Sequence, residues 1–234
     1  MAELIVSHLS KIYNEGKENE VRALDDVSFS LKNGEFAVIL GSSGAGKSTL
    51  LNLLGGMDVA TSGSILLDGD DIASYKPKEL QLYRRQQVGF VFQFYNLMPS
   101  LNALENVQLA ASVVKDPFDA ADMLKAVGLS ERKGNFPSTL SGGEQQRVSI
   151  ARAIVKNPAI LLCDEPTGAL DSKTGASVLK LLSDLSKEYK KTVLIVTHNA
   201  KIAECAERVI RLSDGKLVED ISNEKPKLPE EIVW

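Results

Sequence analysis

A glycine-rich run near the N-terminus has the spacing of a phosphate-binding loop, because it matches the pattern G-x-x-x-x-G-K-[ST]. Its residues are Gly41, Ser42, Ser43, Gly44, Ala45, Gly46, Lys47, Ser48 and Thr49. Such glycines let the backbone turn tightly and point successive N–H groups at an anion, while the following helix presents its partially positive N-terminus. Lys47 adds a positive charge, and the Ser48 hydroxyl is a hard oxygen ligand of the kind that Mg²⁺ prefers. The sequence therefore predicts a site for nucleotide phosphates and Mg²⁺, but the loop alone leaves kinases, GTPases and many ATPases open.

Two adjacent carboxylates, Asp164 and Glu165, follow an apolar run and precede Pro166. If that run is a buried parallel strand, its carboxyl end is where ligands bind in open sheets. Asp164 can hold Mg²⁺ through water. Glu165 can orient or deprotonate an attacking water, a contribution typically worth ~10²–10⁴-fold in rate. The alternative interpretation is a polar strand end that only leads into a turn.

Two further polar residues follow apolar runs of the same kind. His198 comes after residues 193–197, where its imidazole could hydrogen-bond a γ phosphate or the attacking water. Gln93 follows residues 89–92, and its neutral amide can reach Mg²⁺ or water. Beside the loop and the carboxylates, both residues are predicted to respond to the state of a nucleotide.

A second helix start has the features of an anion site. Ser141 and Glu144 match the S-x-x-E capping box, in which the serine begins the helix, and an apolar helical period follows. Gly142 and Gly143 leave the first N–H groups of this helix open to an approaching anion. A capping box by itself is usually only structural, so both roles stay open.

A sheet must bring these residues together, and the sequence predicts an α/β fold with a mostly parallel sheet. Nearly continuous apolar runs, typical of strands covered on both faces, span residues 36–40, 160–163 and 193–197. Residues 4–13 and 27–31 mix polar and apolar positions and predict an antiparallel flank. Helices are expected from Lys47 to about residue 54 and over residues 173–189.

The domain organisation is predicted from a change of pattern along the chain. Residues 76–140 show helical periods broken by prolines, which predicts a helical lobe inserted into a domain of residues 1–222. Residues 223–234 combine prolines and charges, and a solvated tail is the simple interpretation. The alternative is a docked tail whose Trp234 covers a neighbouring surface.

Composition limits the partners. The 234 residues suit one large domain, and 27 basic against 31 acidic residues give a net charge of −4, so no nucleic-acid partner is expected. Cys163 and Cys205 lack metal or redox spacing, which predicts reduced thiols. No run approaches ~18 apolar residues, so a separate subunit would have to supply any membrane-spanning helices.

Taken together and in this order, the motifs resemble the ABC ATPase family over nearly the whole chain. They are the loop 41–49, Gln93, LSGGEQQR at 140–147, ILLCDEP at 160–166, the run 169–171 and His198. The resemblance implies that ATP and Mg²⁺ are bound and that two subunits stack head to tail. In this arrangement the loop of one copy and the Ser141 helix end of the other close on the same ATP. It also implies adenine stacking on Tyr13 and a contact across the pair by Asp171. Tyr13 can equally be a surface packing residue, and Asp171 or Ser172 can cap the following helix.

Residues 92–99, 102–107 and 165–171 are similar to the branch that contains macrolide-export, lipoprotein-release and cell-division ATPases. This resemblance implies an integral membrane permease as partner and a peripheral location on the cytoplasmic face of the cell membrane. It further implies export of a peptide, lipid-linked or drug-like substrate. The stretch between Gln108 and Pro117 is shorter than in many relatives, which puts the coupling surface in question.

Three other functions would use some of the same motifs. Soluble ABC ATPases that act on ribosomes usually carry two cassettes, and those that act on DNA carry a long coiled-coil insertion; the sequence shows neither. A kinase or GTPase would not explain LSGGEQQ, and no NKxD-type guanine motif follows the loop. A non-transporting ABC complex that transmits force or senses a peptide uses the same cassette, so the sequence leaves it open.

Overall fold

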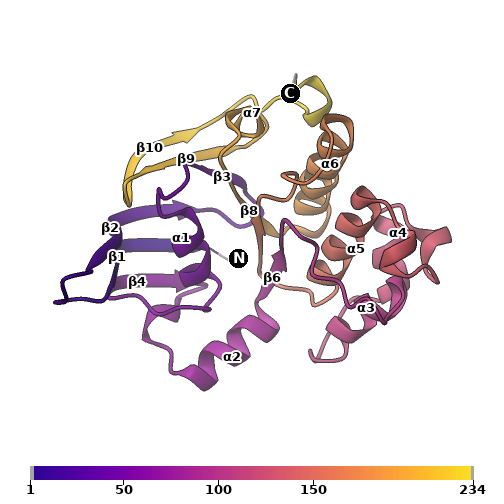
Figure 1. Cartoon of the computed structure of the whole chain (residues 1–234), viewed down its shortest axis with the longest axis horizontal. Coiled ribbons are helices and arrows are strands. Elements are labelled where there is room, and N and C mark those ends of the chain that lie inside the picture. The colour runs from indigo at the N-terminus through magenta and orange to yellow at the C-terminus, as the bar shows by residue number, and fades with distance from the viewer. Residues whose placement is uncertain (1–2, 233–234) are drawn as a thin grey trace.

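The structure is a computed structural model that describes residues 3–232, and it contains two β-sheets (Figure 1). The larger sheet has the strand order β10-β9-β3-β8-β7-β6. These strands are β10 Lys216–Ser222, β9 Arg208–Ser213, β3 Phe36–Leu40, β8 Thr192–Thr197, β7 Ile160–Asp164 and β6 Val88–Val91. All neighbouring pairs are parallel except β9 with β10. The predicted mostly parallel sheet is therefore confirmed.

The smaller sheet is antiparallel and has the order β2-β1-β4-β5. Its strands are β1 Leu4–Tyr13, β2 Val21–Leu31, β4 Ser62–Leu67 and β5 Asp70–Asp71. The antiparallel flank is confirmed, but β2 begins at Val21, before the predicted residue 27. Its pairing with β1 is interrupted by several register shifts, so no regular alternation of apolar residues marks its first half.

The side chains of β3 show why the central strands are apolar throughout. Phe36, Val38 and Leu40 join one buried cluster, whereas Ala37 and Ile39 join the other. Successive strand residues point to opposite faces, and both faces are covered here. The second cluster lies between the larger sheet, the first helix and the smaller sheet, which places the phosphate loop at the junction of the layers.

The helices divide into two groups. The α-helices of the described residues are α1 Lys47–Leu54, α2 Pro77–Gln86, α3 Ala103–Ala111, α4 Ala120–Ala126, α5 Gly142–Ile154, α6 Ser172–Tyr189 and α7 Ala200–Ala203. Single 3₁₀ turns are η1 Ile72–Ser74, η2 Ser130–Arg132, η3 Pro137–Thr139 and η4 Pro229–Glu231. Helices α3, α4 and α5 gather beyond the edge of the larger sheet (Figure 1). Helix α2 does not belong to this group, because its residues Leu80 and Tyr83 pack into the core between the sheets. The helical group therefore begins after β6. The division into a domain with a lobe at 76–140 stays a prediction.

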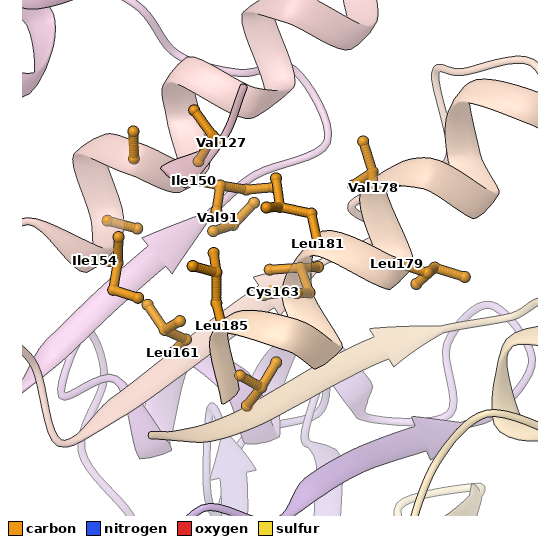
Figure 2. Close-up of a cluster of buried hydrophobic side chains, with 14 of the residues drawn as sticks. Val91, Val127, Ile150, Ile154, Leu161, Cys163, Val178, Leu179, Leu181 and Leu185 are labelled. Atoms are coloured by element: carbon orange, nitrogen blue, oxygen red, sulfur yellow. The ribbon is translucent and has the colours of Figure 1, made fainter. Parts of the chain in front are cut away.

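Helices α5 and α6 pack against β7, the strand that leads to the paired carboxylates (Figure 2). Ile150 and Ile154 of α5 and Leu181 of α6 lie in one buried cluster with Leu161 and Cys163 of β7. Burial of a leucine or isoleucine side chain stabilises a fold by about 1.5–3 kcal/mol. This packing fixes α5 relative to the strand end that carries the chemistry.

The C-terminal segment is docked through Ile232. That side chain is only 6% exposed and joins the core cluster that includes α6, and the Lys227 N–H donates to the Glu204 carbonyl over 2.9 Å. Most of the described tail residues are exposed, so the solvated-tail interpretation fails only where the chain docks, at Pro229 and Ile232. Trp234, to which the docked alternative was tied, lies outside the described residues.

Two predictions from composition can be compared with the structure. Among residues 3–232, no helix combines the length and the apolar character that a bilayer crossing requires. Cys163 and Cys205 are both buried and neither forms a disulfide, in agreement with the predicted thiols. Burial raises the pKa of the Cys205 thiol to about 11, which keeps it protonated at neutral pH.

Candidate active site

Four predicted site residues follow parallel strands of the larger sheet and meet at its carboxyl edge. Gly41 follows β3, Gln93 comes after β6, Glu165 follows β7 and His198 follows β8. A cavity of about 1000 Å³ lies at this edge. The predicted residues that line it are Ser42, Ser43, Gly44, Gly46, Lys47, Ser48, Thr49, Gln93, Asp164, Glu165 and His198. The structure thus brings most of the predicted site into one cavity, as expected for an open parallel sheet.

Glycines shape the phosphate loop. The angle φ is +82° at Gly44 and +96° at Gly46, a region that other residues rarely adopt. A Cβ on Gly46 would also lie 2.5 Å from the Ala23 carbonyl oxygen, and one on Gly41 would lie 2.7 Å from the Leu212 carbonyl oxygen. Ala45, between these glycines, is buried beneath the loop. The loop can be built only with small residues at these points.

The first helix begins without a side-chain cap. Gly46 is the N-cap of α1, and it has no side chain to accept a hydrogen bond from the first turn. Lys47 and Ser48 of this turn line the cavity. Unpaired N–H groups at a helix start are ready to bind an anion, so the sequence-predicted phosphate site has the geometry it needs.

Lys47 and Asp164 bring opposite charges to the cavity. The Lys47 ammonium donates to the carbonyl oxygens of Gly41 and Ser42 over 2.7 and 2.8 Å, which holds it at the loop. Burial and the neighbouring Glu165 charge raise the pKa of the Asp164 carboxyl, while Lys47 opposes the rise. A cation placed beside Asp164 would favour the ionised carboxylate.

The donors that could hold Mg²⁺ are all oxygen groups. Ser48, Gln93 and Asp164 line the same cavity and offer a hydroxyl, an amide and a carboxylate oxygen. Mg²⁺ is usually bound through one or two carboxylates together with substrate phosphates. Residues 3–232 contain no group of three or more His, Cys, Asp or Glu side chains able to hold a metal by themselves. The site therefore fits a Mg²⁺ ion whose coordination the phosphates of a nucleotide complete.

Glu165 is held by the end of the neighbouring strand. The Thr197 hydroxyl donates to Glu165 Oε2 over 2.7 Å, and the His198 N–H donates to Oε1 over 2.9 Å. His198 Nδ1 lies 2.6 Å from the same Oε1. The backbone of Glu165 has a φ of +44°, which a non-glycine residue adopts only when its surroundings impose it. Glu165 is thus fixed in a strained geometry at the cavity, as functional carboxylates often are.

Gln93 contacts the segment that follows Glu165. A Cβ on Gly168 would lie 2.9 Å from Gln93 Nε2, so the amide packs directly on this glycine. The residues after Gln93 lead towards α3, where Asn106 accepts from the Met98 N–H over 2.8 Å and donates to the Met98 carbonyl over 3.1 Å. Gln93 therefore lines the cavity, contacts the segment after Glu165, and is followed by the residues that lead to the helical group.

The predicted capping box at the start of α5 is confirmed, but this helix start lies outside the cavity. The Ser141 N–H donates to Glu144 Oε2 over 2.8 Å, and Ser141 Oγ accepts from the Glu144 N–H over 3.3 Å. Ser141 is exposed, and Gly142 and Gly143 form the first turn of α5. These residues do not line the cavity described above. Within one copy of the described chain, the two predicted anion sites are therefore not brought together.

The two residues assigned only by resemblance take part in local bonds. The Tyr13 hydroxyl donates to Asp58 Oδ2 over 2.8 Å, and the Lys11 ammonium lies 4.8 Å from the centre of the Tyr13 ring. Tyr13 is 36% exposed. Asp171 is the N-cap of α6 and accepts from the Thr174 N–H over 3.1 Å, which confirms the capping alternative. The stacking role of Tyr13 and the contact across a pair by Asp171 stay predictions.

Several cavity residues were missed by sequence reasoning. Ala23 and the two residues before it form one wall, and Asp214 and Gly215 form another part. The Gly215 N–H donates to the Ala45 carbonyl over 3.2 Å, which ties the β9–β10 turn to the phosphate loop. An Asp-Gly pair between two strand-like runs is a hairpin signal, so this turn could have been found. Thr197, which holds Glu165, had no signal other than its position before His198.

Comparison with known families decides what this arrangement is. The family described as ABC transporter matches residues 24–168, which is more than half of the chain. The chain belongs to the ABC transporter family. The matched part contains the phosphate loop, Gln93, Ser141 and the paired carboxylates, so it is the nucleotide-binding ATPase domain of that family.

Relatives extend the similarity over nearly the whole chain. An uncharacterized ABC transporter ATP-binding protein of Mycobacterium tuberculosis strain H37Rv is 43% identical over 224 residues, which cover 94% of this chain and 90% of that protein. The macrolide export ATP-binding/permease protein MacB of Rhodospirillum rubrum is 48% identical over 223 residues, covering 93% of this chain but 34% of that protein. This ABC ATPase domain thus corresponds to about a third of MacB, which is consistent with the macrolide-export-like branch.

Solved structures confirm the predicted fold. A dimeric structure of the ATP-binding cassette MJ0796, in a post-hydrolysis state bound to ADP and Pi, has a TM-score of 0.83 and 42% identity. It covers 94% of this chain and 98% of that one. The structure of cbiO1 from Clostridium perfringens, part of the ABC transporter complex cbiONQ, has a TM-score of 0.84 and 32% identity, with coverages of 97% and 89%. The chain is therefore an ABC ATPase with a P-loop core, an enzyme that hydrolyses ATP.

Proposed function

We propose that this ABC ATPase works as a head-to-tail pair that drives a separate integral membrane permease. The observation that carries the proposal is the separation of its two anion-binding helix starts. The α1 start lines the cavity of about 1000 Å³, whereas none of residues 140–147, all of them described, lines it. Catalysis of phosphoryl transfer depends on donors placed around the transferred group. The Ser141 helix end is therefore best explained as part of the site of a second copy.

The dimers of a close relative support this pairing. MJ0796, which is 42% identical to this chain, is dimeric in two solved structures, one of them with ADP and Pi. In a two-fold pair the same surfaces are used by both copies, so one arrangement completes two equal sites. ATP then acts as part of the interface, and its hydrolysis allows the pair to open.

Within each site, the loop and the α1 start bind the phosphates of ATP, and Lys47 offsets their charge. Glu165 orients and deprotonates the attacking water, and its hydrogen bonds to Thr197 and His198 fix its carboxylate. His198 hydrogen-bonds the γ phosphate or that water. Ser48, Asp164 and Gln93 would hold Mg²⁺, which supplies positive charge next to the phosphate oxygens.

The outer parts of the nucleotide site follow from resemblance. Tyr13 stacks on the adenine ring, and Asp171 contacts the partner near the opposite phosphate loop. Asp171 also caps α6, and a carboxylate can accept several hydrogen bonds at once. The Asp171 contact goes with the pairing and shares its test.

A permease partner is supported by the relatives and by exposed apolar side chains. MacB is named as an ATP-binding/permease protein, and this chain matches only its ATPase part. The segment after Gln93 exposes Phe94 (74%) and Met98 (48%), and the neighbouring α3 region exposes Leu109 and Val113. Exposed apolar side chains of this kind favour a protein partner. The complex would lie on the cytoplasmic face of the cell membrane and export a peptide, lipid-linked or drug-like substrate.

A non-transporting complex is the second candidate. In such a complex, the same closure of the pair transmits force or a signal through the membrane partner. Both candidate functions need a membrane partner, and Phe94→Asp tests for one. The variant should copurify less with a membrane protein from detergent extracts, while ATP hydrolysis by the isolated protein stays unchanged. Transport assays with the captured partner in vesicles then distinguish export from force transmission.

The pairing is tested with Glu165→Gln, which removes the base and changes little volume. We expect turnover to fall by at least ~10², and light scattering to show a dimer with Mg·ATP and a monomer with ADP. Unaltered turnover would contradict the role of Glu165 as base. A variant that binds ATP but stays monomeric at saturating concentrations would contradict the pairing.

A further inference from the structure

A glutamine on α5 is buried deeply and reaches the segment beside the catalytic base. Gln146 is 0% exposed, and its Nε2 donates to the carbonyl oxygen of Pro166 over 2.9 Å. Its Oε1 is buried as well and accepts no hydrogen bond from any residue that the structure describes. A buried amide that uses one of its two ends calls for an explanation beyond packing.

The carbonyl that Gln146 holds belongs to the residue next to Glu165. Pro166 begins a segment of consecutive turns, in which the Gly168 N–H donates to the Glu165 carbonyl and the Leu170 N–H to the Thr167 carbonyl, both over 3.0 Å. This segment ends at the residue that caps α6. Among the described residues, Gln146 supplies the side-chain hydrogen bond to the first residue of this segment.

The conformation of Glu165 depends on restraint from both sides. Its φ of +44° lies in the left-handed region, which costs free energy unless neighbours hold it. Before it, the Glu165 N–H donates to the Val196 carbonyl over 3.0 Å. After it, the Pro166 carbonyl is held by Gln146. Removal of that donor leaves a buried carbonyl unsatisfied, and the segment can regain a partner only by moving.

We propose that Gln146 is a positioning residue for ATP hydrolysis, whose amide fixes the backbone of Glu165 relative to the helix that begins at Ser141. Gln146 lies on the same rigid helix as Ser141, less than two turns from its start. A shift of this helix is therefore passed to the Pro166 carbonyl. In the head-to-tail pair, which is the proposed function on which this step rests, the Ser141 end touches the nucleotide of the partner. Gln146 then links the occupancy of one site to the geometry of the base in the other.

The first test is Gln146→Met, which keeps the length of the side chain and removes the donor. We expect kcat to fall roughly tenfold or more, since small displacements of a catalytic group have large effects on rate, while KM for ATP stays within about twofold. The control is Thr192→Val, which removes a buried hydroxyl that is also hydrogen-bonded to backbone but lies at the end of β8 away from the cavity. Thr192→Val should lower the melting temperature and leave kcat unchanged. A Gln146→Met enzyme that melts earlier but keeps its kcat would overturn the proposal.

The second test uses Gln146→Glu, because a carboxyl group can donate only when it is protonated. Burial raises the pKa of a carboxyl group, so the fraction able to donate grows as the pH falls. We expect the kcat of Gln146→Glu, divided by that of the wild type at the same pH, to rise at least threefold from pH 8.5 to pH 6. A flat ratio would contradict the need for a donor, and this test remains available if the methionine variant does not fold.

The link between sites is tested in the Glu165→Gln background. If Gln146 only positions the base, the double variant should still pair with Mg·ATP, and the single Gln146→Met variant should lose cooperativity in ATP hydrolysis. Loss of pairing in the double variant would instead make Gln146 part of the interface and overturn the proposal. Failure of Glu165→Gln itself to pair would contradict the proposed function, while the kcat of Gln146→Met still decides the positioning role.

Discussion

Helices α1 and α5 both begin with a glycine-rich sequence, yet only the first turn of α5 is capped by a side chain. The start of α1 has no side-chain cap and opens into the cavity of about 1000 Å³. The start of α5 is closed by a reciprocal capping box between Ser141 and Glu144. The Glu144 carboxylate also accepts from Arg132 Nε over 3.1 Å. One helix start therefore has no side-chain partner for its N–H groups, whereas the other has part of them satisfied by its own side chains.

In the proposed head-to-tail pair, this difference gives the two helix starts separate parts in one reaction. An uncapped start gains free energy directly from phosphate, so α1 binds nucleotide in a single copy. A capped start already satisfies part of its N–H groups, so α5 adds a contact only when a pair forms. ATP binding by one copy thus depends on α1, and the additional contact that forms only in a pair depends on α5. This division suits the proposed pair, which closes on ATP and opens after hydrolysis.

The largest effect is expected for Gly46→Ala. A Cβ there would lie 2.5 Å from the Ala23 carbonyl oxygen at a φ of +96°, so the uncapped turn cannot keep its shape. Affinity for ATP measured by titration calorimetry should fall at least ~100-fold, since several phosphate contacts are lost together. Gly69→Ala is the control, because its φ is +90° but nothing lies within 4 Å of the added Cβ. Equal loss of affinity in both variants would show that backbone strain, rather than the loop, is responsible.

A smaller effect is expected for Ser141→Ala. Binding of ATP by a single copy should be unchanged, while kcat falls about tenfold because the partner's γ phosphate loses a contact. The variant also loses a cap, at a cost of about 1 kcal/mol. Asp119→Ala removes the cap of α4 and controls for that loss, with kcat unchanged. Reduced ATP binding by the monomeric Ser141→Ala protein would show that the two helix starts act within one chain.

The smallest effect concerns pH. The Ser141 N–H, which donates to the Glu144 carboxylate, and the nearby Arg132 charge lower the pKa of Glu144 from its ordinary value of 4.5. A lowered pKa stabilises the fold above the ordinary value, and this stabilisation is lost as the pH falls through the folded pKa. Glu144→Gln keeps an acceptor but no charge. The melting temperature of the wild type should exceed that of Glu144→Gln at pH 6 by on the order of 1 °C, since exposed charge pairs contribute little. The difference should shrink as the pH falls below 4.5, and a difference that grows on acidification would contradict the assignment.

Most of the site could be predicted because it is encoded locally. Each of Gly41, Glu165 and His198 follows a short apolar run, and such runs become buried parallel strands whose carboxyl ends meet. The capping box at Ser141 needs only four consecutive residues, and the structure confirms it. The order of the motifs carried the resemblance to the ABC ATPase family, and the comparisons confirm that family.

What could not be predicted depends on contacts between distant segments. The bond from Thr197 to Glu165 exists because β7 and β8 are neighbours, and no local pattern gives strand order. The first half of β2 lacks a regular apolar alternation and pairs with β1 through register shifts, so the cavity wall near Ala23 was missed. Ile232 looked like part of a solvated tail, and its burial follows from a site that α6 provides.

The shared site can be tested by mixing two variants that are each impaired in a different part of the site. Lys47→Ala disables the phosphate loop and keeps the α5 start, whereas Ser141→Ala does the reverse. In a mixed pair one of the two sites receives both intact parts, so random pairing should restore up to roughly a quarter of wild-type ATP hydrolysis. We expect the equimolar mixture to exceed the mean of the two separate variants several-fold. A mixture that never exceeds that mean, although light scattering shows pairs, would contradict a nucleotide site built from two copies.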